Sequence, residues 1–200
     1  MTPAAATTTI DEANFALTLI TSRQSILPKH LVEPGPSLEQ VKLMFIAAAA
    51  APDHGEIRPW RFVVVPGDKR ELLAEVFGQA LCERDPEATT EQVEQAREKA
   101  FRAPFVALAV ARLGPGEPDI DPLERMISVG AALQNFLLMA HSLGFGAGLT
   151  SGQAMRSAVL AQCFGLSEGE RAVCCINVGT ATKRKARRLR PDVDAFVSSL

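Results

Sequence analysis

The chain has 200 residues, of which 47% are hydrophobic and 22% charged, and its formal net charge is -2. This length and composition fit one globular domain with a sizeable core, so we expect residues 1–200 to form a single domain. The near-neutral charge gives no global field that would attract nucleic acid or an anionic membrane, and we expect neither as a partner.

The cysteines indicate a reducing compartment. None of the four is spaced as C-x-x-C, and the adjacent Cys174 and Cys175 lie in a strand-like run, where they would point to opposite faces. We interpret all four as reduced, mostly buried thiols of a cytoplasmic protein.

Residues 1–10 lack the basic start of a signal peptide and are expected to form a flexible extension. The apolar runs are too short or too interrupted to span a membrane.

Apolar spacing predicts the elements in chain order. Ser37 and Gln40 have the pattern of a capping box at the start of one helix. The run 62–65 is typical of a fully buried strand. The segment 126–143 is apolar nearly all round, which predicts a core helix buried on every side, either against other elements or against a copy of itself in a dimer. Helices and strands alternate too irregularly for a doubly wound sheet, which favours an α+β fold. Helices are expected at 11–20, 37–49, 69–82, 90–102, 126–143 and 155–164, and strands at 62–65, 105–111 and 171–178, with a short extended piece after Gly144.

The loop 51–62 (APDHGEIRPWRF) joins a predicted helix to a predicted strand and contains the only tryptophan, Trp60. Pro52 should end the helix, and Pro59 restricts the backbone just before the strand. Charged residues between two apolar elements are typical of a binding site presented by a rigid scaffold. A solvated connection with a buried Trp60 explains the same pattern equally well.

No motif for metal-dependent or nucleophilic catalysis is present. The three histidines, His30, His54 and His141, are far apart in the sequence, so no metal site is expected. The glycine-rich stretch 144–148 follows a helix, which is the wrong context for a Rossmann turn. No catalytic side chain is therefore predicted.

Groups that bind anions recur at three separated places. Hydroxyls and Arg23 cluster at the end of the first predicted helix, and Thr150 and Ser151 precede a predicted helix N-terminus. The third place is a basic run at 183–190, which alone would more simply be a solvated tail or a weak nucleic-acid contact. Together the three places suggest one ligand that carries a phosphate.

Several stretches resemble the FMN-dependent nitroreductase family. Residues 130–146 (GAALQNFLLMAHSLGFG) are similar to its central-helix motif, and the loop 51–62 is similar to its proline- and tryptophan-containing loop. The Asp53-His54 variant in that loop resembles the YdjA-like branch. Residues 23–25 (RQS) and 164–171 (FGLSEGER) also match, in the same order along the chain. The resemblance runs from about Ile10 to the C-terminus.

The resemblance implies a nitroreductase-like fold, in which an antiparallel-dominated mixed sheet is flanked by helices, and an intertwined homodimer with FMN at the subunit interface. Arg23 and Ser25 would hold the phosphate and ribityl chain, with Gln24 alongside. Arg187 in the basic run is the tail residue that we expect to complete the phosphate site. An Arg fork and hydroxyls suit a phosphate dianion.

The flavin ring would be held by both subunits. The resemblance implies that His54 reaches it from the partner subunit and that Leu149, Thr150 and Ser151 lie near the ring or its ribityl chain. The implied activity is an NAD(P)H-dependent oxidoreductase that reduces nitroaromatic, quinone or related small-molecule acceptors by ping-pong hydride transfer through FMN. The flavin supplies the chemistry, which accounts for the lack of a catalytic triad.

Some positions depart from the family pattern. Glu56 and Arg58 replace the usual Asn and Gln, and Ala50 stands where YdjA-like relatives carry an arginine. These changes motivate an alternative, a flavin-binding protein of the same fold with weak or lost turnover. A third interpretation takes the basic run as a nucleic-acid contact. The sequence does not choose the acceptor or between NADH and NADPH.

Overall fold

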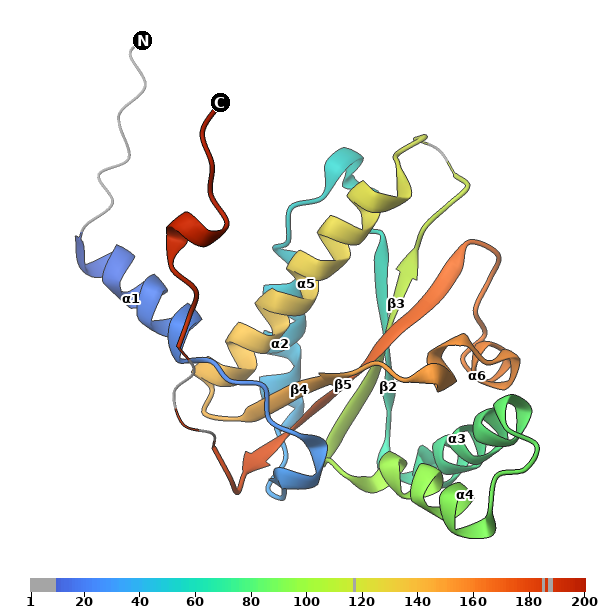
Figure 1. Ribbon diagram of the computed structural model, residues 1–200. Coiled ribbons are helices and arrows are strands. Elements are labelled where there is room, and N and C mark those ends of the chain that lie inside the picture. Colours follow the sequence, from blue (N-terminus) through green and yellow to red (C-terminus); the bar gives the residue numbers. More distant parts are fainter. Residues whose placement is uncertain (1–9, 117, 185, 187–188) are drawn as a thin grey trace.

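The computed structural model describes residues 10–116, 118–184, 186 and 189–200, and it has one central sheet with helices on both faces (Figure 1). The helices are α1 (Ile10–Ser22), α2 (Leu38–Ala49), α3 (Arg70–Arg84), α4 (Thr90–Arg97), α5 (Pro122–Ser142) and α6 (Ala158–Cys163). The strands are β1 (Leu31–Val32), β2 (Trp60–Val65), β3 (Phe105–Arg112), β4 (Gly146–Thr150) and β5 (Glu170–Ala181). Short 3₁₀ helices are η1 (Pro28–His30), η2 (His54–Glu56), η3 (Gly67–Lys69), η4 (Glu98–Phe101), η5 (Gln153–Arg156) and η6 (Val193–Ala195).

The sheet confirms the expected α+β fold. Its order is β1-β5-β3-β2, and β4 pairs with β5. Every pairing between these strands is antiparallel, and the parallel component is an isolated bridge between Ser25 and Ala147. The twelve-residue β5 contacts three other strands, so it organises the sheet.

Alternate residues of the inner strands build two cores, one on each face of the sheet. Ala107 and Ala109 of β3 pack with α2 and α5, whereas Val106 and Leu108 pack with α3 and α6. Small alanines on one face allow α5 to lie close to β3, and aromatic rings, Phe136 among them, fill the remaining space. The two cysteines divide as expected, with Cys174 on one face and Cys175 on the other.

Helix boundaries follow local sequence signals. The expected capping box at α2 is present, with Gln40 N donating to Ser37 Oγ and Ser37 N donating to Gln40 Oε1. Helix α5 begins earlier than expected, because Asp121 caps it and Pro122 occupies its first turn. The expected helices at 90–102 and 155–164 each divide into a short α-helix and a 3₁₀ turn.

Two burial predictions are wrong, and the burial expected for α5 is not reached within the single chain. Strand β2 is an edge strand rather than a fully buried one, and Val64 is 43% exposed. One face of α5 is open, with Ile127 69% exposed. Cys82 and Cys163 are exposed rather than buried.

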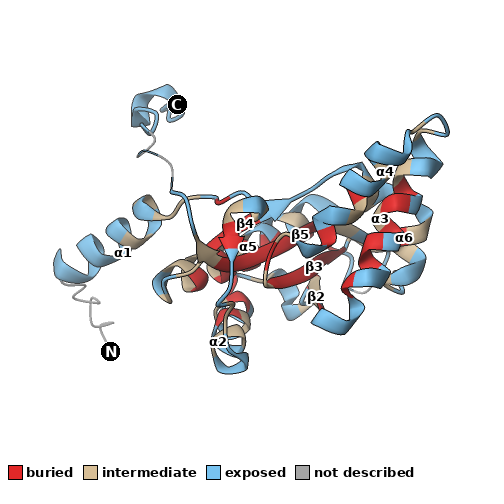
Figure 2. Cartoon of the chain, turned by 90° about the horizontal axis from the view of Figure 1, so that it is seen from below, coloured by how far each residue is buried: buried red, intermediate tan, exposed pale blue. Residues whose placement is uncertain are grey.

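Helix α1 buries no residue at all, and Figure 2 shows it and the C-terminal segment as exposed extensions from the core. The predicted extension 1–10 lies outside the described residues except for Ile10.

Candidate functional site

The segment that follows α1 lies directly against β4, and a glycine permits this contact. Ser25 bridges Ala147, and the Ile26 N–H donates to the Ala147 carbonyl at 2.9 Å. A Cβ at Gly148 would collide with the backbone carbonyl of Ile26, so a larger residue would push the two segments apart. The fold therefore brings residues 23–25 and 149–151, distant in sequence, to neighbouring segments.

Arg23 carries an unsatisfied donor at this place. Its Nε is buried, and no hydrogen-bond partner is present among the described residues. Burial, and secondarily the charge of Arg190, lower the pKa of the Arg23 guanidinium. Buried donors in proteins are normally paired, so an orphaned cationic donor indicates a missing anionic partner.

His141, in the last turn of α5, lies near the cations of this region. Its Nε2 lies 2.9 Å from Ser22 Oγ. The pKa of His141 is lowered by burial, and further by the charges of Arg184 and Arg23. We call Arg23, His141, Arg184 and Arg190 the basic cluster. It forms no salt bridge with a carboxylate in the described part of the chain, which makes it suitable for an anion such as a phosphate.

A cavity of about 720 Å³ opens beyond the end of β4. Leu149, Thr150 and Ser151 line one side, and apolar side chains of α3 and β3 line another, including Phe77 and Val106. Its volume lies within the range of small-molecule and cofactor sites, and mixed apolar walls with a few polar groups are typical of them. A planar aromatic ligand would fit such walls.

The hydroxyls at the cavity are held by β5. Thr150 Oγ1 accepts from Asn177 Nδ2 at 3.1 Å, which leaves the hydroxyl proton of Thr150 free to donate to a ligand. Ser151 Oγ donates to the Val173 carbonyl at 2.9 Å. Asn177 is buried, and its amide also donates to the Gly148 carbonyl at 3.4 Å. These bonds fix the end of β4 before any ligand arrives.

Three basic residues of this cavity were not predicted from the sequence. Arg84, Lys99 and Arg102 line the wall formed by α3 and the α4–η4 segment. The sequence of this segment has the charge pattern of a solvated helix, which hides its contribution to a cavity. A usable signal was its position immediately before the buried strand β3, where its last residues must approach the sheet.

The loop 51–62 lies at the other end of α5. His54 is exposed, and its Nδ1 lies 2.6 Å from Glu124 Oε2 in the first turn of α5. The loop backbone is unusual, because Gly55, Glu56 and Arg58 all have positive φ. Asp53 supports it by accepting from the Arg58 N–H at 2.8 Å.

The helix itself separates His54 from the basic cluster. His141 comes seventeen positions after Glu124, which places the two ends about 25 Å apart at the rise of an α-helix. The structure therefore brings Arg23, Ser25, Leu149, Thr150 and Ser151 to adjoining segments, but not His54. Gln24 is half-buried beside Arg23 in the sequence, and Arg187 lies outside the described residues.

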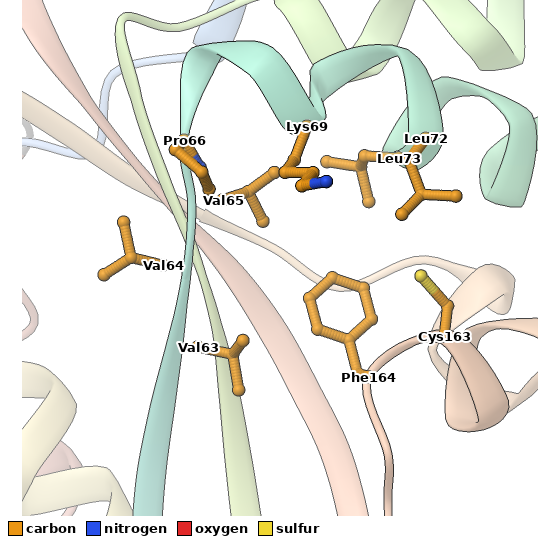
Figure 3. A pocket seen from close by; sticks show the side chains of 9 residues that line it. All are labelled: Val63, Val64, Val65, Pro66, Lys69, Leu72, Leu73, Cys163 and Phe164. Atoms are coloured by element: carbon orange, nitrogen blue, oxygen red, sulfur yellow. The ribbon is translucent and has the colours of Figure 1, made fainter.

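A second cavity of about 180 Å³ lies at the β2 edge and has a different character (Figure 3). Its lining is mostly apolar, with Val63, Leu72 and Phe164 around it and Lys69 as its cation. Across the described residues, no group of histidines, cysteines or carboxylates could hold a metal ion.

No helix in the same residues is long and apolar enough to cross a membrane.

Comparison with known proteins identifies relatives of this chain. The family model for the nitroreductase family matches residues 20–180. A relative from Haemophilus influenzae named "Putative NAD(P)H nitroreductase" is 33% identical over 92% of this chain and 99% of its own length. "Putative NAD(P)H nitroreductase YdjA" from Escherichia coli K12 is 30% identical over 92% of this chain and 98% of its own.

Solved structures have the same fold. A nitroreductase-like family protein from Bacillus cereus superposes with a TM-score of 0.81 at 19% identity, covering 98% of this chain and 99% of its own. A nitroreductase with bound FMN from Desulfitobacterium hafniense superposes with a TM-score of 0.65 at 22% identity, covering 92% and 97%. With the family model spanning most of the sequence, the chain belongs to the nitroreductase family.

Proposed function

We propose that this protein is an FMN-dependent oxidoreductase that uses NAD(P)H to reduce nitroaromatic, quinone or related acceptors. The observation that carries the proposal is the unpaired buried Nε of Arg23, which lies on the segment beside β4 and its large cavity. The FMN bound in a protein of the same fold and the NAD(P)H named in the relatives support this choice of cofactor and reductant.

The residues present fit the parts of FMN. The basic cluster and Ser25 would bind the phosphate, since a dianion needs cationic and hydroxyl donors. Leu149, Thr150 and Ser151, with the apolar wall of the cavity, would hold the ring. Bound FMN would supply hydride transfer, so reductant and acceptor would use the site in turn with ping-pong kinetics. The chain itself contributes binding, orientation and positive charge.

We further propose a homodimer with FMN at the subunit interface. Helix α1 buries no residue, and its apolar side chains, such as Phe15 at 66% exposure, are open to solvent. Val193 and Phe196 near the C-terminus are also more than half exposed. Exposed apolar patches of this kind mark protein interaction sites. A partner subunit would cover them, and it would also supply His54.

The proposed cellular location is the cytoplasm. The cysteines of the described chain are free, and Cys174 and Cys175 lie on opposite faces of β5. Thiols of this kind persist in a reducing compartment, which supports the expectation from the sequence.

One experiment tests the cofactor and the activity in sequence. The visible spectrum of the purified protein is recorded before and after addition of FMN, and the complex is then mixed anaerobically with NADH or NADPH in a stopped-flow instrument. Flavin bands followed by rapid bleaching, and re-oxidation by a quinone, are expected. Protein that remains colourless and ignores added FMN contradicts the proposal.

The alternative is a flavin-binding protein without turnover. It is favoured by the loop 51–62, where Glu56 and Arg58 are exposed and hold positive φ at positions that depart from the family pattern. This alternative predicts bound FMN that neither nicotinamide nucleotide bleaches. The same stopped-flow measurement therefore separates it from the reductase.

A further inference from the structure

The wall of the large cavity formed by α3 and the α4–η4 segment carries cations that form no salt bridge among the described residues. The side chains of Arg84, Lys99 and Arg102 make no hydrogen bond or salt bridge with any residue in the described ranges. Asp85 contributes a carboxylate to the same lining, and its Oδ1 already accepts from the Glu87 N–H at 3.2 Å. The lining therefore has more cationic than anionic groups.

The other arginines of α3 and α4 have hydrogen-bond partners, unlike the three cations of the cavity wall. Arg97 of α4 bonds Glu75 of α3 at 2.6 Å. Arg70 is buried at the start of α3 and donates to the carbonyls of Ala100 and Pro104, both at 2.9 Å. Ala100 directly follows Lys99 in the sequence, and Arg102 lies between Ala100 and Pro104. Arg70 thus fixes the segment that presents the two cations to the cavity.

Apolar side chains line the same cavity. Leu27, Phe77 and Met155 line it together with the end of β4. Cations in a concave site with apolar walls are less screened than on an open surface, which strengthens their attraction for an anion. The combination suits a flat apolar molecule that carries an acidic group.

We infer that the unpaired cations Arg84, Lys99 and Arg102 make this cavity select substrates with an anionic group attached to an apolar or aromatic body. This inference rests on the proposed function and adds a substrate class to it. The anion has two possible sources, the acid group of the oxidant or the 2′-phosphate of NADPH. Both present oxygen acceptors to the same cations.

Two kinetic comparisons distinguish the sources. In the first, kcat/KM for 4-nitrobenzoate is compared with that for neutral 4-nitrobenzamide, with NADH as reductant. In the second, kcat/KM for NADPH is compared with that for NADH, with a neutral quinone as acceptor. A preference of about tenfold or more for the anionic member is expected in at least one comparison, because one charge-assisted bond is worth at least this factor. Added salt should reduce it.

Variants of the wall residues test whether these cations cause the preference for anionic substrates. The double variant Arg84→Gln/Arg102→Gln should lower the ratio of kcat/KM for the anionic member to that for the neutral member at least fivefold. Arg84→Lys/Arg102→Lys retains the charge and should keep most of the preference. Lys69→Gln is the matched control, because Lys69 is an exposed cation that lines the smaller cavity instead.

The outcomes separate this inference from the proposed function. Turnover of the neutral substrates with equal rates for the anionic ones, or a preference that the Gln variant retains, overturns the inference alone. If the protein shows no turnover, calorimetric titration with 4-nitrobenzoate and 4-nitrobenzamide tests the wall directly. Binding of the acid that is no tighter than that of the amide then overturns the inference as well.

Discussion

Glu170 is expected to be a major electrostatic contributor to stability, and this can be tested by replacing it with Gln. The carboxylate lies at the start of β5 and accepts from Arg61 at both oxygens, Nε to Oε1 and Nη2 to Oε2, each at 2.7 Å. It also accepts from the Ser167 N–H at 3.0 Å and faces Arg112 Nε at 3.4 Å. Its side chain is only 9% exposed. The pair joins the ends of β2 and β5 across β3.

The size of the effect follows from the proton affinity of the carboxyl. Hydrogen bonds from Arg61 chiefly lower the pKa of Glu170 from 4.5 to about 2. A shift of this size corresponds to roughly 3 kcal/mol at neutral pH. Since the Arg61 side chain is 25% exposed, solvent screening reduces the expected loss in Glu170→Gln to about 2 kcal/mol.

The pH dependence gives a second, independent check. The folded pKa lies below the unfolded value, so the stabilisation is complete above about pH 4.5 and is lost as the pH falls toward about 2. At pH 3 less than half of it should remain. Urea unfolding at pH 7, 5 and 3, at one protein concentration and followed by Trp60 fluorescence, measures both quantities.

Glu168→Gln is the control, because Glu168 is exposed in the same loop and its side chain pairs with no residue in the part of the chain that the structure describes. A loss below about 0.5 kcal/mol in Glu170→Gln at pH 7 would refute the reasoning, since it is no more than an exposed ion pair contributes. A difference from the native protein that stays constant down to pH 3 would refute the assigned pKa.

Three further predictions concern the site. Arg23→Gln should raise the Kd for FMN about 10- to 100-fold in a fluorescence titration, because a charge-assisted bond to phosphate is lost; an equal change for riboflavin, which has no phosphate, would contradict this. Gly148→Ala should lower the free energy of unfolding by about 1–3 kcal/mol, because the new Cβ meets the Ile26 carbonyl; an unchanged urea midpoint would exclude such a contact. The pKa of His141 is lowered, chiefly by burial, so its neutral form is favoured on folding. The protein should lose stability below about pH 6.5, and parallel urea midpoints for native protein and His141→Gln between pH 7 and 5.5 would count against it.

A structural feature was predicted correctly where a single local sequence pattern determines it. The capping box at Ser37 and Gln40 and the division of Cys174 and Cys175 between two faces are confirmed. The exposed edge of β2 was missed, because the run 62–65 is as apolar as the buried strand β3. An edge position depends on strand order, and no local pattern encodes it.

For the site too, features set by local sequence were predicted, and features set by long-range contacts were missed. Leu149, Thr150 and Ser151 were predicted as neighbours of one ligand, and all three line one cavity. Lys99 and Arg102 were missed, since charged residues on a short helix are usually solvated. Their place in the cavity depends on the buried Arg70, which fixes the η4 segment through carbonyls some thirty residues away in sequence. Such long-range contacts produce no periodic pattern in the sequence.

The geometry of α5 is the reason for proposing that two chains build the site. His54 lies at its first turn, and the basic cluster lies at its last turn. Leu123, Ile127 and Gly130 follow a helical spacing and are all exposed, so they form one open face between the two ends. If two copies of α5 pack antiparallel through this face, the first turn of each lies beside the last turn of the other. His54 of each subunit is then carried toward the Arg23 of its partner, and a two-fold axis generates two equivalent sites.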